Sequence, residues 1–379
     1  MKMKRLAIVA THPVQYFSPI FRYLSAFPHL LEVKCYFACL QGAHYSSIDP
    51  YFGVNVNWDC DVLSGYSYYA STRGDIAEAK GVKGFFSALR SLVSILQNKP
   101  DYVLIFAYSP SYITVLTIFL MLFRIPLLLR ADTSEPAYFR HPIKSFIRKH
   151  CLALYYKNFD HIFPIGAESF KHYLTHNVKP SSLTTVPYAV DTDVIRPSSF
   201  ATHDPKGRLR IGYIGKFTPE KDPLTIIKAI YMLEDCDQER LTLSFVGNGI
   251  LLPALKRSAR RIHCETEFKG FMNQKDLDHF YSSLDVLILP SVEAEVWGLV
   301  VNEALSKGLH LIVSTNVASR HDLIRNNENG SVFMLGSSRS LSHEIKKLLI
   351  RWPWPRVPSC TPSPKDFANT ALSYLCQNS

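Results

Sequence analysis

Short apolar runs that end in polar loops recur along the whole chain. They occupy residues 6–10, 102–107, 126–129, 162–164, 211–214, 241–246, 286–289 and 311–313. A continuous apolar run of this length is typical of a strand buried on both faces of a parallel sheet. Helix-length segments separate the runs, for example 86–97, 223–233, 274–284 and 299–307. Strands that alternate with helices predict doubly wound α/β units.

The predicted elements fall into two groups, which we interpret as an N-terminal domain over 1–195 and a C-terminal domain over 208–350. Residues 196–207 are polar, contain two prolines and predict a linker. Residues 351–379 predict a proline-rich crossing segment and a terminal helix that packs back on the N-terminal domain.

One segment is long enough to cross a bilayer, because residues 102–123 carry no charge. Ser109-Pro110-Ser111 interrupts it after a strand-like half, and the remaining 112–123 is short for a membrane span. We therefore expect a strand, a turn and a buried helix here.

Composition and charge narrow the class of protein. Apolar residues make up 47% of the chain and charged residues 20%, which is ordinary for a globular protein and excludes a disordered or fibrous one. The net charge of +10 favours a phosphate-bearing partner. The eight cysteines are scattered without a C-x-x-C pair, which favours reduced thiols over a zinc site. The first apolar run is too short for a signal peptide, so we expect a cytoplasmic protein.

The segment Glu295-Val-Trp-Gly298-Leu-Val-Val-Asn-Glu303 follows the predicted strand 286–289. Gly298 stands where a helix begins, and free N–H groups at a helix N-terminus bind phosphate. Glu295 and Glu303 can face one pocket, where a carboxylate accepts two hydrogen bonds from a vicinal diol such as ribose.

This pattern resembles the donor-site signature of GT-B glycosyltransferases, in particular the retaining family 4 (group 1). Gly215-Lys216 and Lys221 resemble the loop whose two cations hold the donor diphosphate, with Lys216 where the family usually has Arg. Gly247 resembles the family's V-G-x-G turn, and Phe271 and Met272 the loop that contacts the base.

The resemblance implies a GT-B architecture, with two Rossmann-like domains facing across a cleft. It implies a UDP- or GDP-sugar donor and transfer with retention, without a metal or other cofactor. In that arrangement Glu303 holds the ribose, Lys216 and Lys221 hold the diphosphate, and N–H groups over 298–300 (Gly298, Leu299 and Val300) bind a phosphate. Glu295 faces the sugar and, with the two lysines, forms the expected catalytic set.

The N-terminal half resembles bacterial enzymes that build surface polysaccharides such as O-antigen, capsule or exopolysaccharide. The segment His12-Pro-Val-Gln15-Tyr, which follows the first strand, carries this resemblance together with the later residues 51–53 and 58–59. The resemblance implies that this half binds a glycan acceptor, in particular a lipid-linked oligosaccharide. Tyr108 stands where many members have a sugar-contacting His, and Arg130 and Asp132 are candidates to replace that contact or to form a structural ion pair.

A basic segment over 137–159 suggests a site for the cytoplasmic face of a membrane. Lys144 and Arg148 share a helix face, with Ile143, Phe146, Ile147 and Leu154 as apolar neighbours. The alternative is a solvated helix packed on the domain core. No nucleic-acid-binding module accompanies the basic residues, so nucleic acid is not an expected partner.

Two other functions stay open at this point. One is a GT-B sugar-nucleotide epimerase, which needs no acceptor. The other is a catalytically silent carbohydrate- or membrane-binding protein on the same scaffold.

Overall fold

The computed structural model describes residues 3–43, 47–49, 54–56, 60–133, 142–191, 195, 207–293, 295–353 and 361–377. The chain divides into two compact units. Unit 1 comprises Met1–Ser47, Asn55–Ala189 and Ser363–Ser379, and unit 2 comprises Ile48–Val54 and Val190–Pro362. Of the expected linker, residues 196–206 lie outside the described residues, as do the N-terminal motif positions 51–53 and 58–59.

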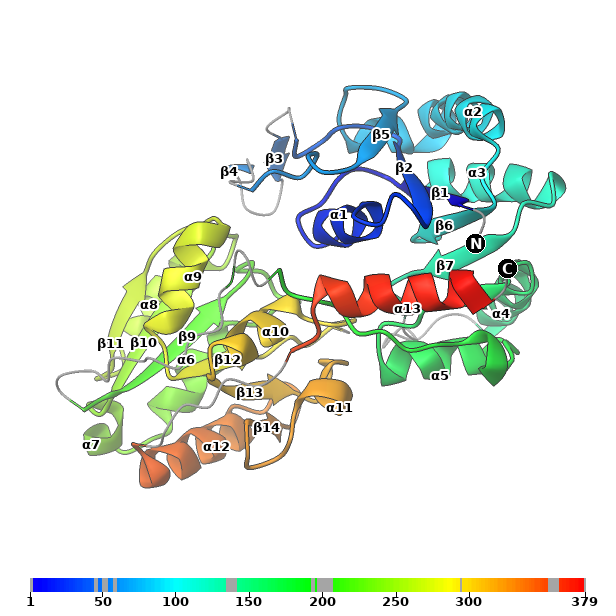
Figure 1. Cartoon of the computed structure of the whole chain (residues 1–379). Helices are drawn as coiled ribbons and strands as arrows, with labels where there is room; N and C mark the ends of the chain where they lie inside the picture. The colour runs from blue at the N-terminus through cyan, green and yellow to red at the C-terminus, as the bar shows by residue number, and fades with distance from the viewer. Residues whose placement is uncertain are drawn as a thin grey trace. The chain divides into compact units, whose positions relative to one another are not determined.

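Unit 1 is built on a six-stranded sheet in which every strand pairing is parallel (Figure 1). Its strands, in spatial order, are β5 (Ser67–Ala70), β2 (Leu31–Phe37), β1 (Lys4–Ala10), β6 (Tyr102–Phe106), β7 (Leu127–Arg130) and β8 (His161–Ile162). The central strands are buried along almost their whole length, as their continuous apolar runs predict.

The helices of unit 1 form one layer on each face of this sheet. They are α1 (Ser18–Ser25), η1 (Ile76–Ala79), α2 (Gly81–Asn98), α3 (Ser111–Leu122), α4 (Pro142–Tyr156), α5 (Ala167–Thr175), η2 (Pro180–Ser182) and α13 (Pro364–Gln377). One core joins α1 and α13 to the sheet through residues such as Phe21 and Phe367. The other core joins α2, α3, α4 and α5 to the opposite face through residues such as Ile95, Leu116 and Tyr156.

The uncharged stretch 102–123 folds as a strand followed by a short helix, as expected from its central break. It forms β6 and α3, which a turn at Ser109-Pro110 separates. Among the helices that the structure describes, none combines the length and apolar character needed to cross a membrane.

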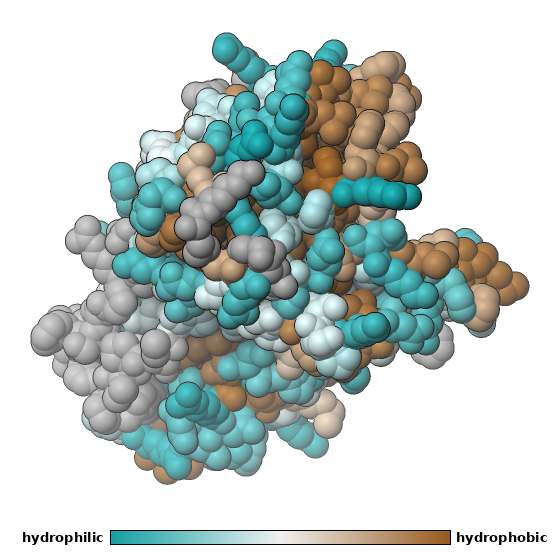
Figure 2. Space-filling model, turned by 45° about the vertical axis from the view of Figure 1, so that its right-hand side comes forward, coloured by the Kyte–Doolittle hydropathy of each residue, from teal (hydrophilic) through white to brown (hydrophobic). Residues whose placement is uncertain are grey.

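Large apolar side chains are exposed on the outer side of the α2–α3–α4 layer. They are Val82, Phe85, Phe86, Val93, Ile118, Leu122 and Phe123 on and beside α2 and α3, and Ile143, Phe146, Ile147 and Leu154 on α4. Figure 2 shows brown patches at the heights that α2, α3 and α4 occupy in Figure 1. Within α4, Ala153 and Tyr156 are the buried residues, so most of this helix faces outward.

Unit 2 repeats the same plan. Its parallel sheet has the order β11 (Glu265–Phe268), β10 (Leu241–Val246), β9 (Leu209–Ile214), β12 (Val286–Leu289), β13 (His310–Ser314) and β14 (Gly330–Phe333). Its helices are α6 (Leu224–Tyr231), α7 (Asp235–Gln238), α8 (Leu252–Ala259), α9 (Gln274–Ser282), α10 (Leu299–Ser306), α11 (Arg320–Leu323) and α12 (Ser338–Arg351). A separate two-stranded sheet pairs β3 (Ser47–Asp49) with β4 (Val54–Val56).

In both sheets the first strand lies in the middle and the strand order reverses beside it. The reversal falls between β1 and β6 in unit 1, and between β9 and β12 in unit 2. Loops diverge in opposite directions at such a point, and ligands of open α/β sheets bind there, beyond the carboxyl ends of the strands. The candidate sites are therefore the loops that follow these four strands.

Candidate active site

Three loops at the carboxyl edge of the unit 2 sheet are joined by backbone hydrogen bonds. The N–H of Gly215 donates to the carbonyl of Val246 at 3.0 Å, and the N–H of Gly247 donates to that of Gly270 at 2.7 Å. Position 247 has a φ of 133°, and a Cβ there would lie 1.9 Å from the carbonyl oxygen of Gly215. Glycine at position 247 thus allows the loops after β9 and β10 to approach closely.

Lys221 and Glu295 form an ion pair between the loops that follow β9 and β12. Their side chains are 32% and 17% exposed, so the pair is partly open to solvent. Ser291, which follows β12, donates its hydroxyl to the same Glu295 oxygen at 3.0 Å. Two catalytic candidates from the sequence therefore lie in direct contact, with a hydroxyl that orients the carboxylate.

The backbone of Glu295 is fixed by a neighbouring loop. Its N–H donates to the carbonyl of Asn316 at 3.1 Å, and its carbonyl accepts from the N–H of Ala318 at 2.9 Å. The amide of Asn316 also donates to the carbonyl of Val292 at 2.7 Å. These bonds hold the carboxylate against the end of the sheet.

Helix α10 begins directly after Gly298, which has a left-handed φ of 79°. A side chain at this position would be strained, and its Cβ would lie 2.8 Å from Leu289. Leu299 and Val300 form the first turn and are half-buried. Their N–H groups belong to a helix N-terminus, the kind of position that favours an anion.

Glu303 lies on α10 and is 2% exposed. The hydroxyl of Tyr281, from α9, donates to its Oε2 at 2.5 Å. Burial raises the pKa of Glu303 from an ordinary 4.5 to about 7, although hydrogen bonds from Tyr281 and Gln274 act in the opposite direction. Glu303 is thus a buried carboxyl that already accepts hydrogen bonds from two neutral donors.

The other predicted donor residues lie on the same loops. Lys216 is half-buried after β9, and its carbonyl accepts from the Tyr213 hydroxyl at 2.7 Å. Phe271 and Met272 are half-buried after β11, and Met272 packs against one of the two cores of unit 2.

In unit 1 the carboxyl ends of β1 and β6 border a pocket of about 270 Å³. Three of the expected acceptor residues line it, namely His12, Tyr108 and Asp132. Burial lowers the pKa of His12 to about 4, so its imidazole is neutral at pH 7, and its Nδ1 lies 2.9 Å from the Thr11 hydroxyl. Asp132 accepts a hydrogen bond from Tyr188 at 2.6 Å.

Two expected acceptor residues do not line this pocket. Gln15 is buried at 7% exposure, and its Oε1 lies 4.0 Å from the Cys60 sulfur. Arg130 donates to the carbonyls of Val186 and Pro187 at 2.8 and 3.1 Å, and its guanidinium lies over the rings of Tyr188 and Phe367. The expectation that Arg130 contacts a ligand is therefore corrected. It is 2% exposed and binds backbone instead, and no ion pair joins it to Asp132 among the described residues.

Solved structures of other proteins share the fold of this chain. HepE from Anabaena, solved with UDP, aligns over 99% of this chain and 100% of its own, with 12% identity and a TM-score of 0.69. The lipopolysaccharide outer core galactosyltransferase WaaB aligns over 98% of this chain and 99% of its own, with 13% identity and a TM-score of 0.69. These likenesses confirm the predicted GT-B fold.

In sequence, residues 195–360 match the family described as Glycosyl transferases group 1. We call these residues the group 1 segment, after the family that they match. An uncharacterized glycosyltransferase of Methanocaldococcus jannaschii, MJ1607, is 25% identical over 142 residues, which are 37% of this chain and 35% of the relative. The chain thus spans about a third of the length of that curated relative.

The group 1 segment contains site residues that sequence reasoning missed. Ser291 and Tyr281 contact the two glutamates, and Asn316 fixes the Glu295 loop. The position of Ser291 directly after a buried strand is a signal that could have identified it. Tyr281 carries no such signal, because its contact depends on how α9 packs beside α10.

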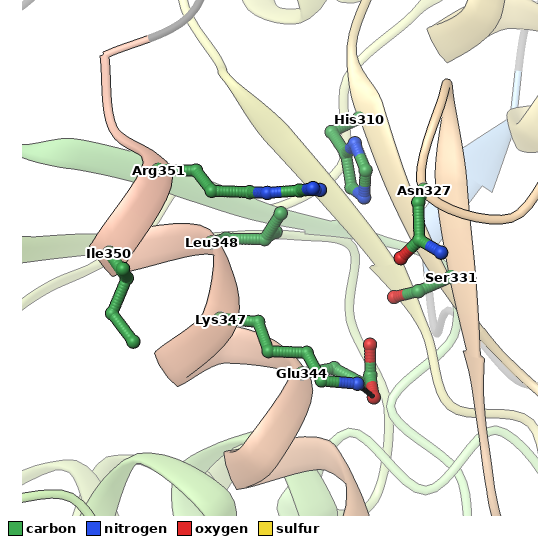
Figure 3. Close-up of a pocket in the computed structure, with 8 residues that line it drawn as sticks. All are labelled: His310, Asn327, Ser331, Glu344, Lys347, Leu348, Ile350 and Arg351. Atoms are coloured by element: carbon green, nitrogen blue, oxygen red, sulfur yellow. Dashed lines mark hydrogen bonds and ion pairs between the residues drawn. The ribbon is translucent and has the colours of Figure 1, made fainter.

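A second pocket of the group 1 segment lies away from these loops, at the amino ends of β13 and β14. It measures about 320 Å³ and is lined by His310 and Ser331 from the sheet and by Lys347 and Arg351 from α12. Figure 3 shows these side chains around it, with Glu344 and Lys347 joined as an ion pair of 2.8 Å. Since it opens at the opposite end of the strands, we do not include it in the candidate active site.

Proposed function

We propose that this protein transfers a sugar from a nucleotide-sugar donor to a glycan acceptor. The observation that carries the proposal is the Lys221–Glu295 ion pair at the strand-order reversal of a group 1 segment. A cation for a diphosphate and a carboxylate for a sugar then lie side by side at the end of β9 and β12. The likeness to HepE, which was solved with UDP, supports UDP as the nucleotide part of the donor.

Each donor residue has a distinct role in this proposal. Glu303 accepts hydrogen bonds from the two ribose hydroxyls, which compensate the cost of its burial. Lys216 and Lys221 neutralise the diphosphate, so that no metal ion is needed for that purpose. The N–H groups of the first turn of α10 bind one phosphate. Phe271 and Met272 contact the base.

The reaction exchanges one bond at the anomeric carbon. The bond from that carbon to the diphosphate oxygen breaks, and a bond to the acceptor oxygen forms on the same face. The acceptor proton passes to the departing phosphate, so the configuration is retained. The two lysines stabilise the charge that develops on the leaving group, while Glu295 faces the sugar.

Unit 1 binds the acceptor in the pocket lined by His12, Tyr108 and Asp132. The acceptor is a lipid-linked oligosaccharide of surface-polysaccharide synthesis, and the likeness to WaaB supports this class. The protein then acts at the inner face of the cytoplasmic membrane. Helix α4 supports such contact because Ile143 and Phe146 are exposed beside Lys144 and Arg148.

The experiment is a panel of UDP- and GDP-sugars tested for binding by thermal shift and calorimetry, then for turnover with lipid-linked oligosaccharides. We expect one donor to bind and to be consumed only when acceptor is present. Donor turnover without acceptor would instead identify an epimerase. If a donor binds but is not turned over with any of the acceptors, the protein is a catalytically silent binding protein.

A further inference from the structure

Helix α2 buries mainly small residues in its first half and exposes large apolar residues along its outer side. Gly84, Ser87, Ala88 and Ser91 are buried, together with Leu92 and Ile95. Val82, Phe86 and Val93 are 73%, 53% and 56% exposed, and Phe85 is exposed beside them. A surface helix in water normally shows the opposite distribution, with its large apolar residues toward the core.

Helix α3 packs against α2 and extends the same surface. It carries no charged residue, and Ile118 and Leu122 are 48% and 72% exposed one turn apart. Phe123 follows them and is also exposed. A helix that is apolar on its outer side needs a partner, because contiguous apolar surface of this kind marks a binding site.

The charges around this surface are mainly positive, although Lys83 is paired with Glu78 at its border. Lys80, Lys83, Arg90, Lys99 and Arg124 are exposed on or beside α2 and α3. Between positions 80 and 131 the sequence has a single acidic residue, Asp101, which accepts a hydrogen bond from the backbone of Arg5. An apolar centre with a basic border is complementary to a bilayer that has anionic headgroups above its acyl chains.

We infer that the outer face of α2 and α3 inserts into an anionic phospholipid surface. Val82, Phe86, Val93, Ile118 and Leu122 enter the boundary between headgroups and acyl chains, and the surrounding cations contact lipid phosphates. This face lies in the same helix layer as α4, since all three helices share one core. The inference rests on the proposed function, which places the protein at a membrane. It assigns the insertion into that membrane to α2 and α3, not to α4 alone.

The test is flotation of the full chain with vesicles of phosphatidylglycerol and phosphatidylethanolamine, at low and at high salt. Salt screens the cations but leaves apolar insertion in place, so the wild type retains salt-resistant binding. The triple variant Val82→Gln, Phe86→Gln and Val93→Gln should lower the partition coefficient at high salt by about tenfold or more. Glutamine keeps the helix propensity of these exposed positions.

A matched control replaces three equally exposed apolar residues of unit 2, Tyr231→Gln, Met334→Gln and Ile350→Gln. It should float like the wild type. Calorimetric UDP binding of all three proteins separates this inference from the proposed function, since the α2 variant should keep its nucleotide affinity. If the wild type does not bind UDP, the proposed function is overturned, whereas the result of the flotation experiment still stands.

Three results would overturn the inference. One is the absence of wild-type flotation at low salt. Another is an α2 variant that floats like the wild type at high salt. The third is a wild-type dimer in light scattering that the α2 substitutions dissociate while vesicles remain unbound, which would assign this face to a second copy of the chain.

Discussion

The ammonium group of Lys221 is bound to the carboxylate of Glu295 across two loops of one sheet edge. A diphosphate that takes the cation must therefore compete with Glu295 for it. The carboxylate keeps the Ser291 hydroxyl as its second partner, so it stays oriented when the lysine is drawn to phosphate. The ion pair thus links occupation of the phosphate site to the state of the sugar-facing carboxylate.

Lys221→Ala should lower kcat by about a hundredfold or more, the usual cost of losing one group that stabilises a leaving anion. Lys216→Ala should lower it as well. Initial rates with saturating donor measure both effects. In the same assay turnover should survive a chelator, and activity that chelator abolishes and magnesium or manganese restores would contradict the assignment of the diphosphate to lysines.

Glu295→Gln should reduce kcat more than it reduces UDP affinity, because the interaction with the sugar is strongest in the transition state. Ser291→Ala should show the same pattern more weakly, since Ser291 acts by orienting Glu295. Steady-state kinetics and calorimetry give the two quantities separately. NMR of the product reports the anomeric configuration, and inversion would rule out the mechanism proposed above.

Glu303→Ala should weaken UDP binding at least tenfold. A hydrogen bond to a charged group contributes about 1.5–3 kcal/mol, and the ribose would lose such an acceptor. Isothermal calorimetry at pH 7.5 measures the change, with the exposed Glu328→Gln as control. An unchanged Kd would remove Glu303 from the donor site.

Glu303 should also make the free protein less stable as the pH rises from about 4.5 to 7. Its folded pKa of about 7 exceeds the ordinary value of 4.5, so the folded state keeps a proton that the unfolded state has released. The contribution is full below 4.5, falls across this window and is constant above 7, with a total on the order of 3 kcal/mol. In thermal melts the melting temperature of Glu303→Gln should rise relative to that of the wild type as the pH increases across this window. A difference in melting temperature that does not change with pH would contradict the raised pKa.

Arg130→Ala should destabilise unit 1 and leave the affinity for UDP unchanged. The substitution leaves the buried carbonyls of Val186 and Pro187 without their donor, at about 1–3 kcal/mol each. Thermal melts report the loss and calorimetry with UDP reports the affinity. Arg130→Lys should recover part of the stability, and a normal melting temperature for Arg130→Ala would show that the guanidinium is not structural.

The sequence predicts most of the inner strands and the edge strand β8, but it misses the inner strand β2 and the edge strands β5, β11 and β14. β6, β12 and β13 are buried along almost their whole length and therefore appear in the sequence as continuous apolar runs. β11, with the sequence Glu-Thr-Glu-Phe, lies at an edge and alternates exposed with half-buried positions. β5 is also an edge strand without an apolar run, so both strands escape a search for such runs.

In the candidate site, the sequence identifies residues that lie close together in the chain but not their partners from distant elements. Glu295, Gly298 and Glu303 stand close together in the chain, and their spacing identifies them. The partners of the glutamates come from other elements, as Tyr281 does, and pairwise packing cannot be read from one sequence. Arg130 illustrates the converse, because a buried guanidinium that binds carbonyls has the same residue type and strand-end position as one that binds a ligand.

The return of α13 to unit 1 has a consequence for synthesis on the ribosome. Phe367, Ala368, Ala371 and Leu375 belong to the core that also holds α1 and β1, although the whole of unit 2 lies between them in the chain. The ribosome therefore translates the whole of unit 2 before α13 is available. Unit 1, although it emerges first, cannot complete one of its two cores until then. Until then only α1 covers that sheet face, and the apolar residues that α13 will cover stay exposed in the nascent polypeptide, where chaperones can bind them.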